Sequence, residues 1–238
     1  MKKQITYLLL LVILCLTCTA SSAQERKWED IDTTGFYKKQ VIARNGFELT
    51  FINKAPQFDT VTGQRMIGLF FRVYPQEVMR FNHKASRKVT FVISSEWKGV
   101  AATIGAVIKF DPSWLEKNPQ DIDCATHELM HVIQAYHSQA NPGWLVEGIA
   151  DYGREAFGNN NKNAGWSLTA YRHGQLYTDS YRTTARFLIW TEKRYNKDLV
   201  KKLDDAMRAG KYTDELWVSL TGKTVDELWY LYTVNPIV

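Results

Sequence analysis

The chain has 238 residues, a formal net charge of +5 and 45% hydrophobic residues, which suits one globular domain with a sizeable core. The charge is only mildly basic and no lysine or arginine cluster is present, so the charge gives no argument for nucleic-acid binding. Of the three cysteines, Cys15 and Cys18 lie close to the N-terminus. If that segment is removed, Cys124 has no partner for an internal disulfide and packing must supply the stability.

The first 23 residues have the layout of a secretory signal. Lys2 and Lys3 precede an apolar run from Ile5 to Leu16, and small residues follow up to Ala23. This pattern predicts cleavage after Ala23 and export to a periplasm or to the outside of the cell. The apolar run is too short for a membrane span, so no stable membrane insertion is expected after cleavage.

The first half of the remaining chain mixes strand and helix patterns. Alternation of apolar and polar residues predicts strands, and apolar residues at helical spacing predict a helix that Pro75 breaks or kinks. The predicted elements are an extended lead-in (24–46), a strand (47–51), a helix (62–82), a strand (88–94) and a strand or hairpin around Gly105 (100–111).

The second half is predicted to be helical. Asp111 and Pro112 have the pattern of a helix start. The predicted helices that follow span roughly 121–136, 144–157, 180–195, 197–209, 212–220 and 224–233. We therefore expect an α+β fold, with residues 24–238 forming one domain of two lobes, an α/β lobe to about residue 138 and a helical lobe from about residue 139.

A His-Glu-x-x-His motif lies on the predicted helix 121–136, formed by His127, Glu128 and His131. Residues four apart share one face of a helix, so the two imidazoles can bind the same metal ion. Glu128 lies beside them, where it can accept a proton from a metal-bound water. The motif therefore predicts Zn²⁺ as cofactor, two zinc ligands and a general base.

Two residues are candidates for the third ligand. His137 would complete a metzincin-like pattern, but Gln134 stands where that pattern has a glycine, so the helix is expected to continue past it. Glu147 would instead complete a His₂Glu site from the next helix. Asp151 lies one turn after Glu147 and can accept a hydrogen bond from the second ring nitrogen of His127. Because this helix is otherwise apolar, its two acids need partners.

Three blocks of the sequence resemble the plant basic secretory proteins and their bacterial relatives. They are HELMHVIQAY (127–136), PGWLVEGIADYGR (142–154) and SYRTTARFLIW (180–190), and the resemblance covers roughly residues 85–195. It implies a zincin-like, gluzincin-type fold, metallopeptidase activity and Glu147 rather than His137 as the third ligand. It also implies Tyr181 as the hydrogen-bond donor to the reaction oxyanion. His173, which stands alone in a loop rich in tyrosine and arginine, is a second candidate for this role.

These features together predict a secreted zinc-dependent peptidase that hydrolyses peptide bonds with Glu128 as general base. The strand before the motif helix, Val100–Gly105, is small and uncharged, so an extended peptide substrate can pair with its edge. The alternative functions are a catalytically inactive binding module on the same fold, or a metzincin-like enzyme that uses His137.

Overall fold

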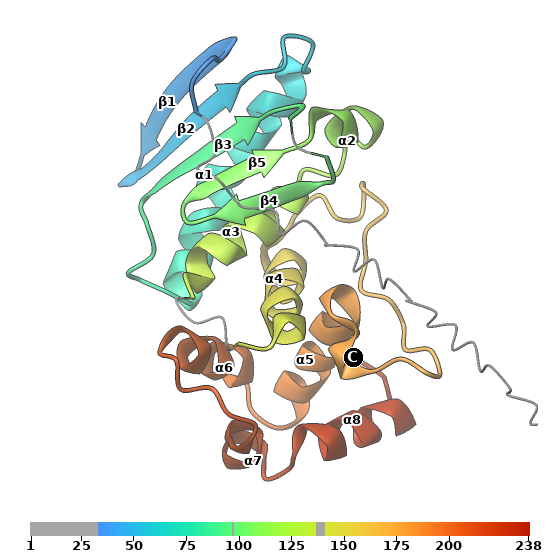
Figure 1. The fold of residues 1–238 in the computed structure, drawn as a ribbon. Helices are drawn as coiled ribbons and strands as arrows, with labels where there is room; N and C mark the ends of the chain where they lie inside the picture. The colour runs from blue at the N-terminus through green and yellow to red at the C-terminus, as the bar shows by residue number, and fades with distance from the viewer. Residues whose placement is uncertain (1–32, 97, 137–140) are drawn as a thin grey trace, which may run out of the picture. The chain divides into compact units, whose positions relative to one another are not determined.

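The computed structural model describes residues 33–96, 98–136 and 141–238, so the predicted signal peptide and His137 lie outside the described residues. Within these ranges the chain forms a five-stranded sheet, with one long helix between its second and third strands, and then a series of helices (Figure 1). The elements are β1 (Lys38–Arg44), β2 (Phe47–Asn53), α1 (Thr60–Arg80), β3 (Lys88–Ile93), β4 (Ala101–Ile104), β5 (Val107–Phe110), α2 (Pro112–Lys117), α3 (Cys124–Gln134), α4 (Gly143–Phe157), η1 (Tyr177–Asp179), α5 (Tyr181–Arg194), α6 (Leu199–Arg208), α7 (Glu215–Thr221) and α8 (Val225–Val234).

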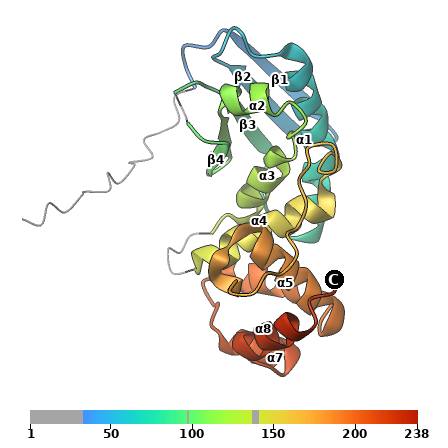
Figure 2. The ribbon, with the colours of Figure 1, turned by 90° about the vertical axis from the view of Figure 1, so that its right-hand side faces the viewer.

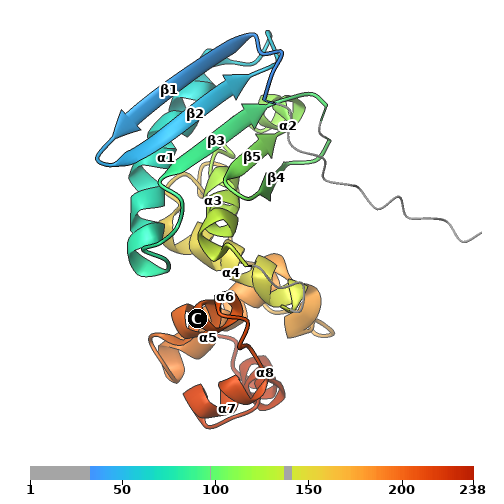
Figure 3. The ribbon, with the colours of Figure 1, turned by 60° about the vertical axis from the view of Figure 1, so that its left-hand side comes forward.

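The strand order in the sheet is β1-β2-β3-β5-β4, which leaves β4 at one edge. β2, β3 and β5 run parallel to one another, whereas β1 and β4 pair antiparallel with β2 and β5. α1 and α3 lie together against one face of the sheet (Figure 3). The core here consists of apolar side chains from β2, β3 and β5 that face these two helices. This packing places the motif helix α3 directly beside the edge strand β4.

The helical part of the chain follows α3 in layers. α4 packs between α3 and α5, and α7 and α8 lie beyond α5 (Figure 2). Aromatic side chains dominate the core of this part, where the Phe187 ring lies 5.9 Å from Trp217 and 5.2 Å from Trp229. Such large rings bury much apolar area in a region that has no sheet. No helix in the described ranges is long and apolar enough to cross a membrane.

The predicted α+β class is confirmed, and the helices of the second half form at the expected places. Three local expectations were wrong. The lead-in contains strand β1, whose mostly exposed side chains gave no alternating pattern. α1 continues through Pro75 without the expected break, because the flanking residues Val73, Tyr74 and Val78 are fully buried and their packing offsets the missing hydrogen bond; the alternative of a kink stays a prediction.

The third wrong expectation concerns the end of α3. The helix ends at Gln134 and does not continue to residue 136, because Ala135 adopts a left-handed conformation with φ 42°. Ala135 thus makes the turn for which a glycine was expected. The missing glycine at Gln134 therefore gives no argument against His137. The arguments for Glu147 as the third ligand are its place on the next helix and the family resemblance.

A buried acid in α1 gives the first testable prediction. Glu77 is fully buried, and neither of its carboxyl oxygens has a hydrogen-bond partner within the described ranges. Burial raises the pKa of Glu77 well above 4.5, so the folded protein holds a proton that the unfolded chain releases. The free energy of unfolding should therefore fall as the pH rises from about 4.5 through the raised pKa of Glu77.

We expect Glu77→Gln to remove this component of the pH dependence, since the amide does not titrate. Urea unfolding of metal-free protein at pH 5 and pH 8 measures it. Glu116→Gln, at an exposed position of α2, is the matched control and should keep the dependence of the unmodified protein. An unchanged pH dependence in Glu77→Gln would show that Glu77 does not titrate between the two values.

Candidate metal centre

Three side chains from α3 and α4 converge on one point. His127 and His131 project from the same face of α3, and Glu147 approaches from α4. The Nε2 atoms of the two histidines lie 3.2 Å apart. The Glu147 Oε2 atom lies 3.2 Å from Nε2 of His127 and 3.6 Å from Nε2 of His131. One ligand atom from each residue lies within 4.8 Å of the others, so the three can hold a single metal ion.

The second nitrogen of each imidazole is held by a neighbour. His127 Nδ1 lies 2.7 Å from Asp151 Oδ1, and His131 Nδ1 lies 2.7 Å from Gln134 Oε1. Because a carboxylate oxygen and an amide oxygen are acceptors, both Nδ1 atoms carry a proton, and the Nε2 atoms that face the cluster are the ones that can bind a metal ion once they are deprotonated. The structure thus places Asp151 where the sequence analysis placed it. Gln134 is an additional partner that the sequence analysis missed.

The cluster has the electrostatics of a cation site. Burial lowers the pKa of His127, but its hydrogen bonds to Asp151 and Glu147 outweigh this and raise the pKa to about 10. Burial also disfavours the charged form of Glu147 and so raises its pKa. The hydrogen bonds and charges of His127 and His131 outweigh this effect and hold the pKa of Glu147 far below its usual value. The acids of α4 therefore favour positive charge between the helices. A divalent ion would supply that charge in place of the histidine protons.

Glu128 lies beside the cluster, and a residue of the sheet holds its side chain. The Thr103 Oγ1 atom lies 2.7 Å from Glu128 Oε2 and 3.1 Å from the Glu128 main-chain oxygen. Thr103 belongs to the edge strand β4, so its hydroxyl connects the predicted substrate strand to the predicted base. The sequence analysis recognised the small, uncharged character of this strand but missed the role of Thr103. A lone threonine at this distance in the sequence carries no signal of such a contact.

Tyr181 lies over the cluster from the start of α5. Its ring is nearly parallel to that of His127, with an interplanar angle of 18° and centroids 6.0 Å apart. Partial burial is the largest effect that raises the pKa of Tyr181, and the carboxylates of Glu147, Asp151 and Glu128 raise it further. The phenol therefore keeps its proton near neutral pH. By contrast, His173 lies exposed in the loop between α4 and η1.

A glycine in α4 allows α5 to approach the cluster. A Cβ atom at Gly148 would lie 2.2 Å from Cγ2 of Thr184, so only glycine fits this crossing of α4 and α5. Gly148 directly follows Glu147, and Thr184 lies one turn after Tyr181. The close crossing therefore brings the tyrosine toward the ligand-bearing helix.

The fold and this cluster define a candidate metal-dependent hydrolase. The family model described as peptidase of plants and bacteria (BSP) matches residues 48–232. The match covers more than half of the chain, so the chain belongs to this family of peptidases. The resemblance seen in the three sequence blocks is thereby confirmed. No curated protein matches the sequence.

Two solved structures of longer proteins match this chain in part. An aminopeptidase N family protein from Idiomarina loihiensis has 8% sequence identity and a TM-score of 0.49, over 81% of this chain and 46% of that chain. An M1 zinc metallopeptidase from Deinococcus radiodurans has 13% identity and a TM-score of 0.45, over 84% of this chain and 48% of that chain. The present chain thus spans about half the length of these proteins.

The hydrogen bond between Asp151 and His127 gives the second prediction. Asp151→Asn can offer its NH₂ group to Nδ1 and would favour the wrong tautomer of His127. We expect affinity for zinc to fall about 10- to 100-fold while the protein stays folded. Competition with a chromophoric chelator measures the affinity. Glu155→Gln, an exposed position on the same helix, is the control. Equal affinity in Asp151→Asn and in the control would contradict this role.

Proposed function

We propose that this chain is an exported zinc-dependent peptidase. The observation that supports it most directly is the convergence of Nε2 of His127, Nε2 of His131 and the Glu147 carboxylate, with Glu128 adjacent. Membership of a peptidase family gives the reaction class. The N-terminal layout of residues 1–23 supports export, and we propose residues 24–238 as one domain.

The spacing of the three donors fits zinc. Donors about 2.0–2.1 Å from a tetrahedral zinc ion lie roughly 3.3 Å from one another. The three separations here are 3.2, 3.2 and 3.6 Å. A set of two imidazoles and one carboxylate is also the ligand type of catalytic zinc sites, in which a fourth position stays open. His127, His131 and Glu147 would therefore hold the ion, with Asp151 and Gln134 fixing the imidazoles.

The remaining residues perform the acid and base steps. Zinc, when bound, would supply an acidified water molecule and polarise the peptide carbonyl. Glu128 accepts the proton of the attacking water and then delivers it to the leaving amine. Thr103 holds the Glu128 carboxylate in place for both transfers. The protonated phenol of Tyr181 donates a hydrogen bond to the oxygen on which negative charge develops.

The substrate is proposed to bind as an extended peptide along β4. Among the described residues this strand pairs with β5 alone, so its other edge has no strand partner in that part of the chain. An extended peptide can add to such an edge as a further strand. Because Thr103 of β4 contacts Glu128, a peptide on this edge would lie beside the base.

The third prediction separates catalysis from metal binding. Glu128→Gln should lower kcat for cleavage of a denatured protein by about 10²- to 10⁴-fold, because the amide cannot accept the proton. Zinc content should be unchanged, because Glu128 is not one of the three ligands. Glu147→Ala should instead lose zinc, and a chelator should abolish activity in the unmodified protein.

Two results would contradict the proposal. The metal centre would be rejected if neither the purified unmodified protein nor the Glu147→Ala variant binds zinc. Protein that binds one zinc ion through His127, His131 and Glu147 but cleaves no peptide would reject the peptidase and favour the binding module.

The fourth prediction concerns Tyr181. Tyr181→Phe removes only the hydroxyl, so kcat should fall about 10²- to 10³-fold with little change in KM or zinc affinity. Steady-state kinetics on a peptide substrate measure both constants. Tyr230→Phe is the control, since Tyr230 lies exposed on α8. A normal kcat in Tyr181→Phe would remove Tyr181 from the mechanism.

A further inference from the structure

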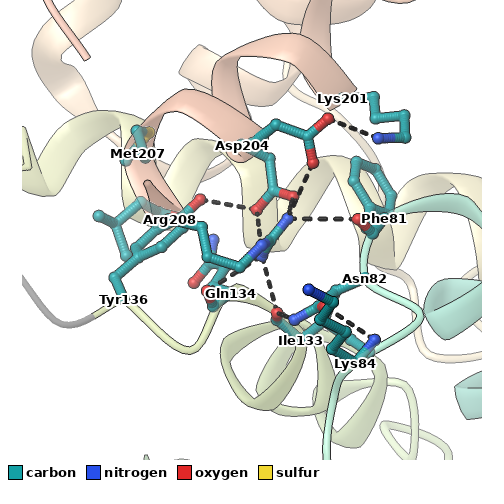
Figure 4. A network of polar contacts seen from close by, with 12 residues as sticks. Phe81, Asn82, Lys84, Ile133, Gln134, Tyr136, Lys201, Asp204, Met207 and Arg208 are labelled. Carbon is teal, nitrogen blue, oxygen red and sulfur yellow. Dashed lines mark hydrogen bonds and ion pairs between the residues drawn. The ribbon is translucent and has the colours of Figure 1, made fainter. Parts of the chain in front are cut away.

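Arg208, near the end of α6, lies where three separate segments meet (Figure 4). Its Nη1 atom donates hydrogen bonds to the main-chain oxygens of Ile133 and Gln134, at 2.9 and 3.0 Å. Its Nη2 atom donates to the main-chain oxygen of Phe81, just after α1, at 3.2 Å. One guanidinium group thus joins α6 to the ends of α1 and α3.

The guanidinium is held by a carboxylate that is fully buried. Asp204, one turn earlier in α6, accepts hydrogen bonds from Nη1 and Nη2 of Arg208. The hydroxyl of Tyr136, just after α3, donates to the same carboxylate at 2.9 Å. A planar fork held on one side by a buried carboxylate has a fixed orientation. Its remaining N–H groups therefore point at the carbonyls in a defined direction.

The end of α3 needs these donors. The last carbonyl groups of a helix have no partner within the helix. The left-handed turn at Ala135 ends α3; Ala135 itself is exposed, but both Ile133 and Gln134 are buried. The Asn82 side-chain amide gives Ile133 a second donor at 2.9 Å. Arg208 supplies the donor for Gln134, and its positive charge is favourable at the C-terminal end of the helix dipole.

Gln134 is also the link to the metal centre. Its side-chain Oε1 accepts from His131 Nδ1 at 2.7 Å, and its Nε2 donates to the Val146 main-chain oxygen at 2.8 Å. Val146 directly precedes Glu147. One glutamine therefore touches a ligand on α3 and the backbone beside the ligand on α4. The direction of its side chain depends on its own main chain, which Arg208 holds.

We propose that Arg208 is a positioning residue of the metal centre that acts through Gln134 on His131 and on the backbone beside Glu147. This inference rests on the proposed metal centre, although it needs no peptidase activity. A merely structural role, in which Arg208 only fastens α6 to the end of α3, would lower stability and leave the centre unchanged.

The test compares Arg208→Lys, Gln134→Met and the double variant, with Co²⁺ as the probe. Lysine keeps the charge but cannot make the fork, so the Gln134 main chain loses its fixed donor. We expect Arg208→Lys to bind Co²⁺ about 10-fold more weakly and to change the visible absorption of the bound Co²⁺. Gln134→Met should behave likewise. The double variant should bind no more weakly than Gln134→Met, because both changes act on one path.

Lys202→Met is the matched control on the same helix. Lys202 lies exposed on α6, and within the described residues no side-chain contact joins it to Arg208 or to the cluster. Its Co²⁺ affinity and spectrum should equal those of the unmodified protein. Tyr136→Phe gives a milder variant in case Arg208→Lys fails to fold. Losing one hydrogen bond to Asp204 should weaken Co²⁺ binding about 3-fold.

Several outcomes would overturn the inference. A lower melting temperature with unchanged Co²⁺ affinity and spectrum in Arg208→Lys would leave a structural role only. Affinity losses that multiply in the double variant would exclude action through Gln134. Unchanged Co²⁺ affinity in Tyr136→Phe would count against it if the lysine variant does not fold. Failure of the unmodified protein to bind Co²⁺ would reject the inference together with the proposed function, and normal Co²⁺ binding without peptidase activity would reject the proposed function alone.

Discussion

The crossing of α3 over α4 is governed by the need to balance charge in a partly buried space. His127 and Asp151 are almost fully buried, and Glu147 lies between His127 and His131. Burying an ionised group is unfavourable unless it is paired and hydrogen-bonded. Each imidazole therefore has an acceptor at Nδ1, and Glu147 lies at both Nε2 atoms. Removing either helix would leave charges without partners, so the register of α3 against α4 is tightly specified.

Three neighbouring elements each contact this crossing through a side chain or a close packing contact. The sheet contributes Thr103, which holds Glu128 from the edge strand. α6 contributes Arg208, which holds the main chain of Gln134. α5 packs closely at Gly148, where a Cβ atom would overlap Thr184. The sheet and the helices on either side of the crossing are thus joined to it by contacts between residues far apart in the sequence.

The sequence predicted the parts of this centre that follow from local spacing. His127 and His131 are four apart on one helix, and two acids on the otherwise apolar α4 require partners. Thr103 and Arg208 could not be found in this way, because their contacts connect separate segments. Gln134 lies three residues after His131 on the same helix, so local spacing allowed this contact, but Gln134 was considered only for its effect on the end of the helix. β1 was missed because its exposed side chains show no alternation, and the end of α3 was missed because alanine rarely adopts the left-handed conformation of Ala135.

The backbone at the start of α5 is strained where this helix approaches the cluster. Ser180 and Tyr181 have φ values of 66° and 50°, whereas helix starts usually have negative φ. Two adjacent residues in sparsely populated regions are unfavourable by about 1–3 kcal/mol each, and they persist only where the surroundings fix them. Here the Thr184 hydroxyl donates to the Tyr177 main-chain oxygen at 2.5 Å, and Thr184 packs against Gly148. The result is a tyrosine ring parallel to His127. A helix selected for stability alone would not begin with such a conformation, so the strain is better explained by the position of Tyr181 over the cluster.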